Sequence, residues 1–413
     1  MPKIKPFDGF LIRNEHAEQV VAPEYDTVPA SQRRAFADAN PQNFLNTMRL
    51  QEDFDPNAPP SHEELLAFNR RNLERLLAEG YFNPLEKPCI FIYELTHGDH
   101  GQTGVVCEIS ADEYDQGHVR KHENTRRERE DLLAQYQKEV GVTSCPISLA
   151  YPQSKEIDAF IKTQTAAPPL LDFTTGDDVH QRVWCIDDQQ TQNKLSALFE
   201  SVENTYLTDG HHRAASGWRY AEMMRKTNGN RGDEPYNQLL VALFSDHELN
   251  LYPFNRCVRD LGGKSEQQVL DALAERFRIN VAENQDTFEP SEHGEFGMYL
   301  GKTWYCLDIK PGLIDYSDPV ASLDVSILQD HILAPVLGIV DARSDPRLDY
   351  VSGVEGKAGL EKKSEQEGWA ICFSCYATSM DQLMNVADAR ALMPPKSTYF
   401  DPKTRSGVFV RLK

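Results

Sequence analysis

The chain has 413 residues, of which 43 are basic and 64 acidic, and its formal net charge is −21 at pH 7. This acidic balance argues against a nucleic-acid backbone as the main partner and favours a soluble protein with a small-molecule site. The length exceeds that of a typical single hydrophobic core, so we expect two domains, residues 1–260 and 261–413.

Cysteine usage and hydropathy indicate a cytoplasmic protein. The eight cysteines are scattered, and Cys372 and Cys375 form one close pair without a second pair to complete a zinc site. No stretch reaches the roughly 18 apolar residues of a membrane span, and no apolar segment follows the N-terminus. We therefore expect no membrane partner, and the sequence leaves homo-oligomer formation open.

The N-terminal part of the chain alternates short apolar runs with turn residues. Segments 7–11 and 19–28 are interrupted by Gly and Pro and predict strands or extended loops, and 40–45 predicts a turn leading into a strand. A capping box at Ser61-His-Glu-Glu64 opens a helix that ends at Gly80. The runs 88–95 and 104–109 predict a hairpin. Tyr25 and Asp26 lie in a polar corner that is either an active-site edge or a surface turn.

A densely charged segment, 117–130, leads into a helix that we expect to run to about residue 140. Its His122-Glu123 pair resembles the start of a zinc-protease motif, but Arg126 occupies the position where that motif needs a second histidine. Most of these charges predict a solvated helix face. The residues at its start are candidates for a site: Arg120, His122, Glu123 and Thr125.

The central part of the chain predicts strands at 170–173 and 181–186, a helix at 190–202, and then a strand that meets a turn at Asp209-Gly210. Apolar residues recur every three to four positions after this turn, so a helix should extend to about Lys226. His211, His212 and Arg213 fall in its first turn, where unpaired N–H groups and a guanidinium suit phosphate oxygens. In the alternative, the turn is buried and Arg213 pairs with a carboxylate.

The C-terminal part predicts a buried strand at 239–244, a strand at 249–257, and helices opened by capping boxes at Ser265 and Ser379. It also predicts a hairpin at 296–307, an apolar helix at 323–339 interrupted by Pro335, and strands at 369–376 and 408–412. Two polar stretches, 341–347 and 394–406, lie between these elements. In the second, Lys396, Lys403 and Arg405 form either an anion clamp or surface ion pairs. Lys396-Ser-Thr lacks the glycines of a P-loop.

Over nearly its whole length the chain resembles the bacterial and archaeal domain-of-unknown-function family numbered 1015. The matching segments are 21–26, 40–45, 122–125, 209–213, 296–299, 323–328 and 393–398. The family pattern commonly has two prolines before the tyrosine, whereas this chain has Pro23-Glu24. The resemblance therefore extends to Tyr25 and Asp26 and not to Glu24.

The strand, the Asp-Gly-His-His-Arg turn and the helix are similar to the ParB/sulfiredoxin superfamily. That resemblance implies nucleotide phosphates bound at the helix start, and the superfamily includes free-serine kinases. Sulfiredoxin itself needs a cysteine beside the His-Arg pair, and Asp209-Gly210-His211 has none; the basic character and helix-turn-helix module of ParB-type proteins are not evident either. We expect a mixed α/β fold with a ParB/sulfiredoxin-like nucleotide-binding core and a packed C-terminal α/β region.

Taken with these residues, the resemblance implies a phosphotransferase that uses ATP or ADP and Mg²⁺ on a small hydroxy compound, with serine or phosphoserine the best candidate. The expected catalytic groups are Asp209, Asp26 and Glu123, with Asp209 also the metal ligand. The expected nucleotide contacts are Gly210, His211, His212, Arg213, Lys396 and Arg405, and the expected substrate contacts are Tyr25, His122 and Thr125. The alternatives are a nucleotide-binding regulatory protein without turnover and a metal-dependent phosphohydrolase. If one site exists, Tyr25, Asp26, His122, Glu123 and 209–213 should converge on it.

Overall fold

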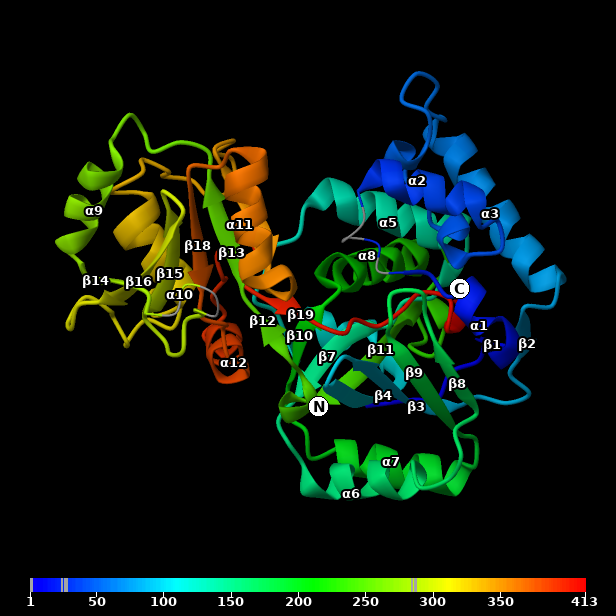
Figure 1. The fold of residues 1–413 in the computed structure, drawn as a ribbon. Coiled ribbons are helices and arrows are strands. Elements are labelled where there is room, and N and C mark those ends of the chain that lie inside the picture. The colour runs from blue at the N-terminus through cyan, green and yellow to red at the C-terminus, as the bar shows by residue number, and fades with distance from the viewer. Residues whose placement is uncertain (1–2, 24, 26–28, 284, 286–287) are drawn as a thin grey trace. The chain divides into compact units, whose positions relative to one another are not determined.

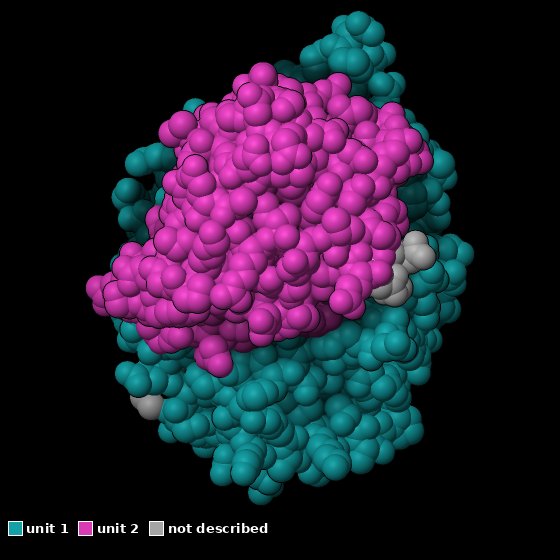
Figure 2. Space-filling view, turned by 60° about the vertical axis from the view of Figure 1, so that its left-hand side comes forward, with its two compact units in different colours: residues 1–249, 402–413 teal, residues 250–401 magenta. Residues whose placement is uncertain are grey.

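The computed structural model describes residues 3–23, 25, 29–283, 285 and 288–413. They divide into two compact units: unit 1 runs up to Leu249 and resumes at Pro402–Lys413, and unit 2 is Asn250–Asp401 (Figure 2). The chain thus leaves unit 1 before the expected boundary at 260, and its last residues belong to unit 1 and not to a separate C-terminal region. Unit 2 is an insertion within unit 1.

Unit 1 is built on a mixed sheet that contains eight strands of the described chain (Figure 1). All eight residues of β11, Gln238–Ser245, are buried, as its continuous apolar sequence predicts. It pairs in parallel with β7 (Ile147–Tyr151) and antiparallel with β4 (His100–Ser110). The order across the sheet is β5 (Val119–Arg120), β10 (Thr205–Asp209), β7, β11, β4, β3 (Ile90–His97), β9 (His180–Ile186) and β8 (Leu171–Thr174). The predicted β3–β4 hairpin and β8–β9 pair are confirmed.

Helices cover both faces of this sheet. α6 (Lys155–Gln164) and α7 (Gln189–Phe199) lie on one side, and α5 (Arg127–Glu139) and α8 (His211–Asn228) lie on the other (Figure 1). Gly217 permits the close approach of α8 to β11, because a Cβ there would lie 2.4 Å from a methyl group of Leu239. The remaining helices of unit 1 are α1 (Asn14–Val20), α2 (Ala30–Ala39), α3 (His62–Ala78) and α4 (Ala111–Asp115).

Two N-terminal expectations are wrong. Residues 19–20 belong to helix α1, whose Ala17 and Val20 are buried one turn apart, so the expected extended segment begins too early. Phe44–Thr47 forms a 3₁₀ turn in place of a strand, because the side chain of Asn43 accepts a hydrogen bond from Leu45 N at 3.0 Å. The capping box of α3 is present, with Ser61 Oγ accepting from Glu64 N at 3.3 Å.

A second, smaller sheet of unit 1 brings together strands from distant parts of the sequence. Its order is β2 (Phe82–Pro84), β1 (Phe10–Ile12), β20 (Phe409–Leu412) and β6 (Val142–Thr143). β20 is antiparallel to both β1 and β6. These pairings hold the C-terminal strand in unit 1, and residues 402–408, which precede β20, also belong to unit 1.

Unit 2 is a sheet with helices on both faces. The strand order is β14 (Phe277–Val281), β16 (Thr303–Ile309), β15 (Glu295–Leu300), β18 (Ile371–Cys375), β13 (Phe254–Val258) and β17 (Leu348–Ser352). Residues alternate between two cores: Ile371 and Phe373 pack with α9 (Glu266–Ala274) and α10 (Asp324–Leu328), whereas Cys372 packs with Leu360 of α11 (Gly356–Glu367). The other elements of unit 2 are β12 (Leu251–Tyr252), β19 (Tyr399–Phe400) and α12 (Met380–Asp388).

The helix in segment 323–339 is shorter than the sequence predicted. α10 ends at Leu328 and is followed by a π-helical turn, Gln329–Leu333, in which Ala334 N donates to Gln329 O at 2.9 Å. Pro335 has no N–H and its ring crowds the preceding turn, so the regular ladder cannot continue. The mixed α/β class is confirmed, and among the described helices none is long and apolar enough to cross a bilayer.

Candidate functional site

The predicted strand, turn and helix meet at Gly210. β10 ends at Asp209, Gly210 has φ 93° and ψ 32°, and α8 begins at His211. A side chain at Gly210 would be strained by this left-handed conformation, and its Cβ would lie 2.7 Å from Nε of Arg213. The backbone at residue 210 therefore lets the Arg213 side chain fold back over the turn.

The Asp209 carboxylate lies between two cations. Its Oδ2 pairs with the guanidinium of Arg213, and its Oδ1 lies 3.7 Å from Nζ of Lys403. Burial disfavours the charged carboxylate, but Lys403 and Arg213 together outweigh this cost and lower the pKa of Asp209. Asp209 is therefore ionised at neutral pH.

Arg213 donates hydrogen bonds to Asp209 and to the loop before β7. Besides Asp209, its guanidinium donates to the sulfur of Cys145 and, at 3.1 Å, to the carbonyl oxygen of Pro146. In the structure Arg213 thus pairs with a carboxylate, which is the alternative that the sequence left open. Arg213 fixes the turn and the loop before β7 to each other.

Cys145 was not a candidate from the sequence. It lies in a Ser-Cys-Pro segment just before β7, and its sulfur is 3.5 Å from the carbonyl oxygen of Thr404. The turn 209–211 has no cysteine of its own, so the thiol beside Arg213 comes from a remote part of the sequence. No local motif marks such a neighbour, because only the tertiary fold brings it there.

Arg405 is a buried cation in the same C-terminal segment as Lys403. Its NH2 pairs with Asp177 at 2.7 Å, and the residue is 3% exposed. Its Nε and NH1 are buried and have no hydrogen-bond partner among the described residues. Burial raises the pKa of the neighbouring Tyr93 phenol, and Arg405 partly opposes this shift. Two donor groups of Arg405 are therefore not satisfied by the described residues.

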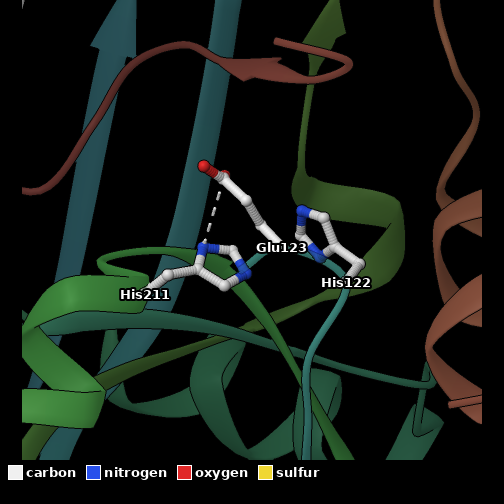
Figure 3. Close-up of side chains that lie close together, drawn as sticks. All are labelled: His122, Glu123 and His211. Carbon is white, nitrogen blue, oxygen red and sulfur yellow. Dashed lines mark ion pairs between the residues drawn. The ribbon is translucent and has the colours of Figure 1, made fainter. Parts of the chain in front are cut away.

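His122, Glu123 and His211 lie close together. Figure 3 shows the Glu123 carboxylate pointing toward the His211 ring, with His122 beside them. Nδ1 of His211 lies 3.9 Å from Oε2 of Glu123, and the two imidazole rings pack edge to face with centroids 4.5 Å apart. Burial, assisted by the neighbouring cationic groups, holds the pKa of His211 well below its usual range, and burial lowers that of His122 to about 4.

Thr125 and His212 lie near the contact between helices α5 and α8. Thr125 Oγ1 donates to Glu130 at 2.5 Å, and Arg219 of α8 donates to the other oxygen of Glu130 at 2.9 Å. The N–H of Arg126 donates to Nε2 of His212 at 3.2 Å. These contacts give both residues a structural role next to the cluster of His122, Glu123 and His211.

Tyr25 and Lys396, which were also predicted as site residues, contact residues outside the Asp209 turn. The Tyr25 hydroxyl donates to Asp53 at 2.7 Å, and the Arg33 guanidinium lies 4.1 Å from the centre of the Tyr25 ring. Burial, with the contact to Asp53, raises the pKa of Tyr25. Asp26 lies outside the described residues, and Lys396 belongs to unit 2, where its ammonium stands over the ring of Phe254. Convergence of Tyr25 and Asp26 on the Asp209 turn thus stays a prediction.

The chain belongs to the family described as "Protein of unknown function (DUF1015)", which matches residues 4–326. The resemblance predicted from the spaced motifs is confirmed. Among curated proteins, none matches the chain significantly.

Similar chains among solved structures include a conserved hypothetical protein from Pyrococcus furiosus, with 12% identity and a TM-score of 0.34, covering 72% of this chain and 93% of that one. A free serine kinase in complex with AMP has 12% identity and a TM-score of 0.35, covering 73% and 90%. SbnI from Staphylococcus aureus, truncated at its C-terminus, has 10% identity and a TM-score of 0.33, covering 72% and 84%. These identities are too low to transfer residue roles to this chain.

Proposed function

We propose that unit 1 is a nucleotide-dependent phosphotransferase that acts on a small hydroxy compound, with serine or phosphoserine the best candidate. The observation that carries this proposal is the ionised Asp209 carboxylate, held between Lys403 and Arg213 where β10 meets the start of α8. Phosphoryl transfer needs positioned positive charge and a carboxylate that orients the acceptor hydroxyl. This corner supplies both.

The phosphate-binding groups come from two segments. Ala214 N–H makes the first intrahelical bond of α8, to Gly210 O at 2.9 Å, so the amides of His211, His212 and Arg213 precede the helical ladder and lie at its positive end. Lys403 and Arg405 add two cations from the C-terminal segment. The unpartnered N–H groups of Arg405 suit a phosphate oxygen.

Asp209 serves as the general base or as a metal ligand. An ionised carboxylate oxygen is the kind of ligand that Mg²⁺ prefers, so Asp209 fits the ion that accompanies ATP or ADP. When bound, Mg²⁺ neutralises charge on the phosphates. The chain itself positions the carboxylate: the Arg213 pair fixes its orientation, and Lys403 keeps it ionised. Glu123 is the second carboxylate candidate.

We also propose a cytoplasmic location. All eight cysteines are free thiols, as expected in a reducing compartment.

One set of incubations tests the proposed activity. The protein is mixed with phosphoserine and Mg²⁺, with and without ADP, and ATP, serine and free phosphate are measured. ADP-dependent formation of ATP and serine supports transfer. Release of phosphate without ADP would instead support a metal-dependent phosphohydrolase. Nucleotide binding without any product would support a regulatory protein and contradict the proposal.

A further inference from the structure

We infer that His122, Glu123 and His211 bind a divalent transition-metal ion such as Zn²⁺, at a site distinct from the proposed Mg²⁺ ligand Asp209. One ligand atom from each of the three residues lies within 4.8 Å of the others. Figure 3 shows the three side chains close together, with His122 and Glu123 coming from the loop after β5 and His211 from the start of α8. This inference goes beyond the proposed phosphotransfer, and it assigns Glu123 to the metal in place of a second catalytic carboxylate.

The donor set selects the class of metal. Two imidazole nitrogens and one carboxylate oxygen suit Zn²⁺ and related transition ions, whereas Mg²⁺ and Ca²⁺ prefer oxygen ligands throughout. Three protein ligands leave the fourth tetrahedral position for water or a substrate atom. Metal bonds of about 2.0–2.2 Å place ligand atoms ~3.4 Å apart, so the 3.9 Å between His211 and Glu123 requires only a small side-chain shift.

The burial of the two histidines is an independent observation that points to a ligand. His122 is 2% exposed and His211 is 7% exposed. Neither ring nitrogen of His122, nor Nε2 of His211, has a hydrogen-bond partner among the described residues, although the Leu207 backbone lies close enough to His122 to favour its charged form slightly. Buried polar groups in folded proteins are nearly always satisfied. A metal bond satisfies one ring nitrogen of His122.

The ligand chemistry of the cluster agrees with this reading. A neutral imidazole offers a nitrogen lone pair, and an ionised carboxylate offers an oxygen. Nδ1 of His211 and Oε2 of Glu123 already face each other at 3.9 Å. A divalent cation attracts the carboxylate and both nitrogen lone pairs at once.

Two of the three ligands are buried, and the third is accessible to solvent. His211 is the first residue of α8, directly after the constrained Gly210, and its ring packs against that of His122. The Glu123 side chain is 51% exposed, so an ion can enter from solvent on the carboxylate side. The exposed carboxylate therefore marks the side from which an ion can reach the buried histidines.

Zn²⁺ binding to the chelator-treated full-length chain, measured by calorimetry without nucleotide, tests the inference. We expect one ion per chain, retained against a hundredfold excess of Mg²⁺. Glu123→Gln should weaken the affinity at least tenfold, whereas Glu128→Gln, which removes the charge of an exposed glutamate nearby on α5, should leave it unchanged. Substitution with Co²⁺ should give the visible absorption bands of a tetrahedral nitrogen-containing site.

Histidine variants complete the test. His122→Asn should abolish the Co²⁺ bands, and His247→Asn, at an exposed position, should retain them. If His122→Asn fails to fold, the comparison of the two glutamate variants still decides. Equal Zn²⁺ affinity in the wild-type chain and Glu123→Gln, or displacement of Zn²⁺ by Mg²⁺, would overturn the inference. Because no nucleotide is present, that result would leave the phosphotransfer proposal standing.

Discussion

The Lys403 ammonium lies 3.7 Å from the Asp209 carboxylate, although nearly half of the chain separates the two residues in sequence. Lys403 follows the return of the chain from unit 2, and Asp209 ends β10. Their proximity joins the C-terminal segment to the turn that begins α8. It also keeps the carboxylate ionised beside the start of α8.

Lys403→Met should weaken ADP binding by about 10- to 100-fold, because a charge-assisted contact to phosphate contributes about 1.5–3 kcal/mol. Methionine keeps the length and the apolar stem of lysine, so the protein should remain folded. Lys226→Met, at an exposed position near the end of α8, is the matched control and should bind ADP normally. Calorimetry gives both affinities, and unchanged ADP binding in Lys403→Met would remove Lys403 from the site.

Asp209→Asn should remain folded, keep most nucleotide affinity and lose turnover by a factor of about a hundred or more. Asparagine can still accept a hydrogen bond from Arg213, but it lacks the charge that a base or a metal ligand needs. Asp178→Asn, in the exposed turn between β8 and β9, is the control and should retain full turnover. A phosphoryl-transfer assay beside calorimetry makes the measurement; an active Asp209→Asn protein would end the catalytic assignment.

Gly210→Ala should destabilise the protein more than Gly80→Ala. Both glycines have a left-handed backbone, with φ 93° and 78°, so both variants incur the cost of ~1–2 kcal/mol for a side chain in that conformation. Gly80 has open space around its Cβ position, whereas at Gly210 the new methyl group would displace the Arg213 guanidinium. Urea unfolding gives both free energies, and equal losses would show that Arg213 moves at no cost.

Asp324 should make the stability of unit 2 depend on pH. It is 2% exposed, and burial raises its pKa to about 6, although the Gly294 N–H at 2.7 Å and His293 favour its charged form. The folded state therefore binds a proton more tightly than the unfolded state, whose aspartate pKa is about 3.9. Stability from this group is greatest below pH 4, falls by at most about 3 kcal/mol as the pH rises from 4 to 6, and is then constant.

Asp324→Asn removes this dependence while keeping an oxygen that can accept from Gly294. The variant should therefore gain stability relative to the wild type between pH 4 and 7. Asp330→Asn, an exposed carboxylate in the following turn, should follow the wild-type pH profile. Thermal unfolding across this pH range provides the test, and parallel curves for wild type and Asp324→Asn would contradict the expected shift.

Local chemistry was sufficient to predict the Asp209–Gly210 corner, the capped helices and the hairpins. An Asp-Gly pair before a helical pattern specifies a left-handed residue at the turn, and φ of Gly210 agrees. Short elements were harder to predict from the sequence. The apolar pair Ala17 and Val20 of α1 is too brief to mark a helix against the proline that follows at Pro23.

The contacts inside the site could not be predicted in the same way. Cys145 reaches Arg213, and Lys403 reaches Asp209, through the packing of separate elements, and neither sequence neighbourhood carries a signal for its partner. The sequence identified His122 and Glu123 as polar residues at a helix start. It gave no sign that His122 would be buried without a hydrogen-bond partner, since adjacent charges suggest exposure.

The insertion of unit 2 has a consequence for the nascent chain. Asn250 and Asp401, the first and last residues of unit 2, are joined by a backbone hydrogen bond of 3.4 Å, and β12 pairs with β19 beside them. A ribosome must therefore release all of unit 2 before Lys403 and Arg405 can reach their partners and β20 can fill the gap between β1 and β6. During synthesis, the Asp209 turn therefore lacks Lys403 until all of unit 2 has been translated.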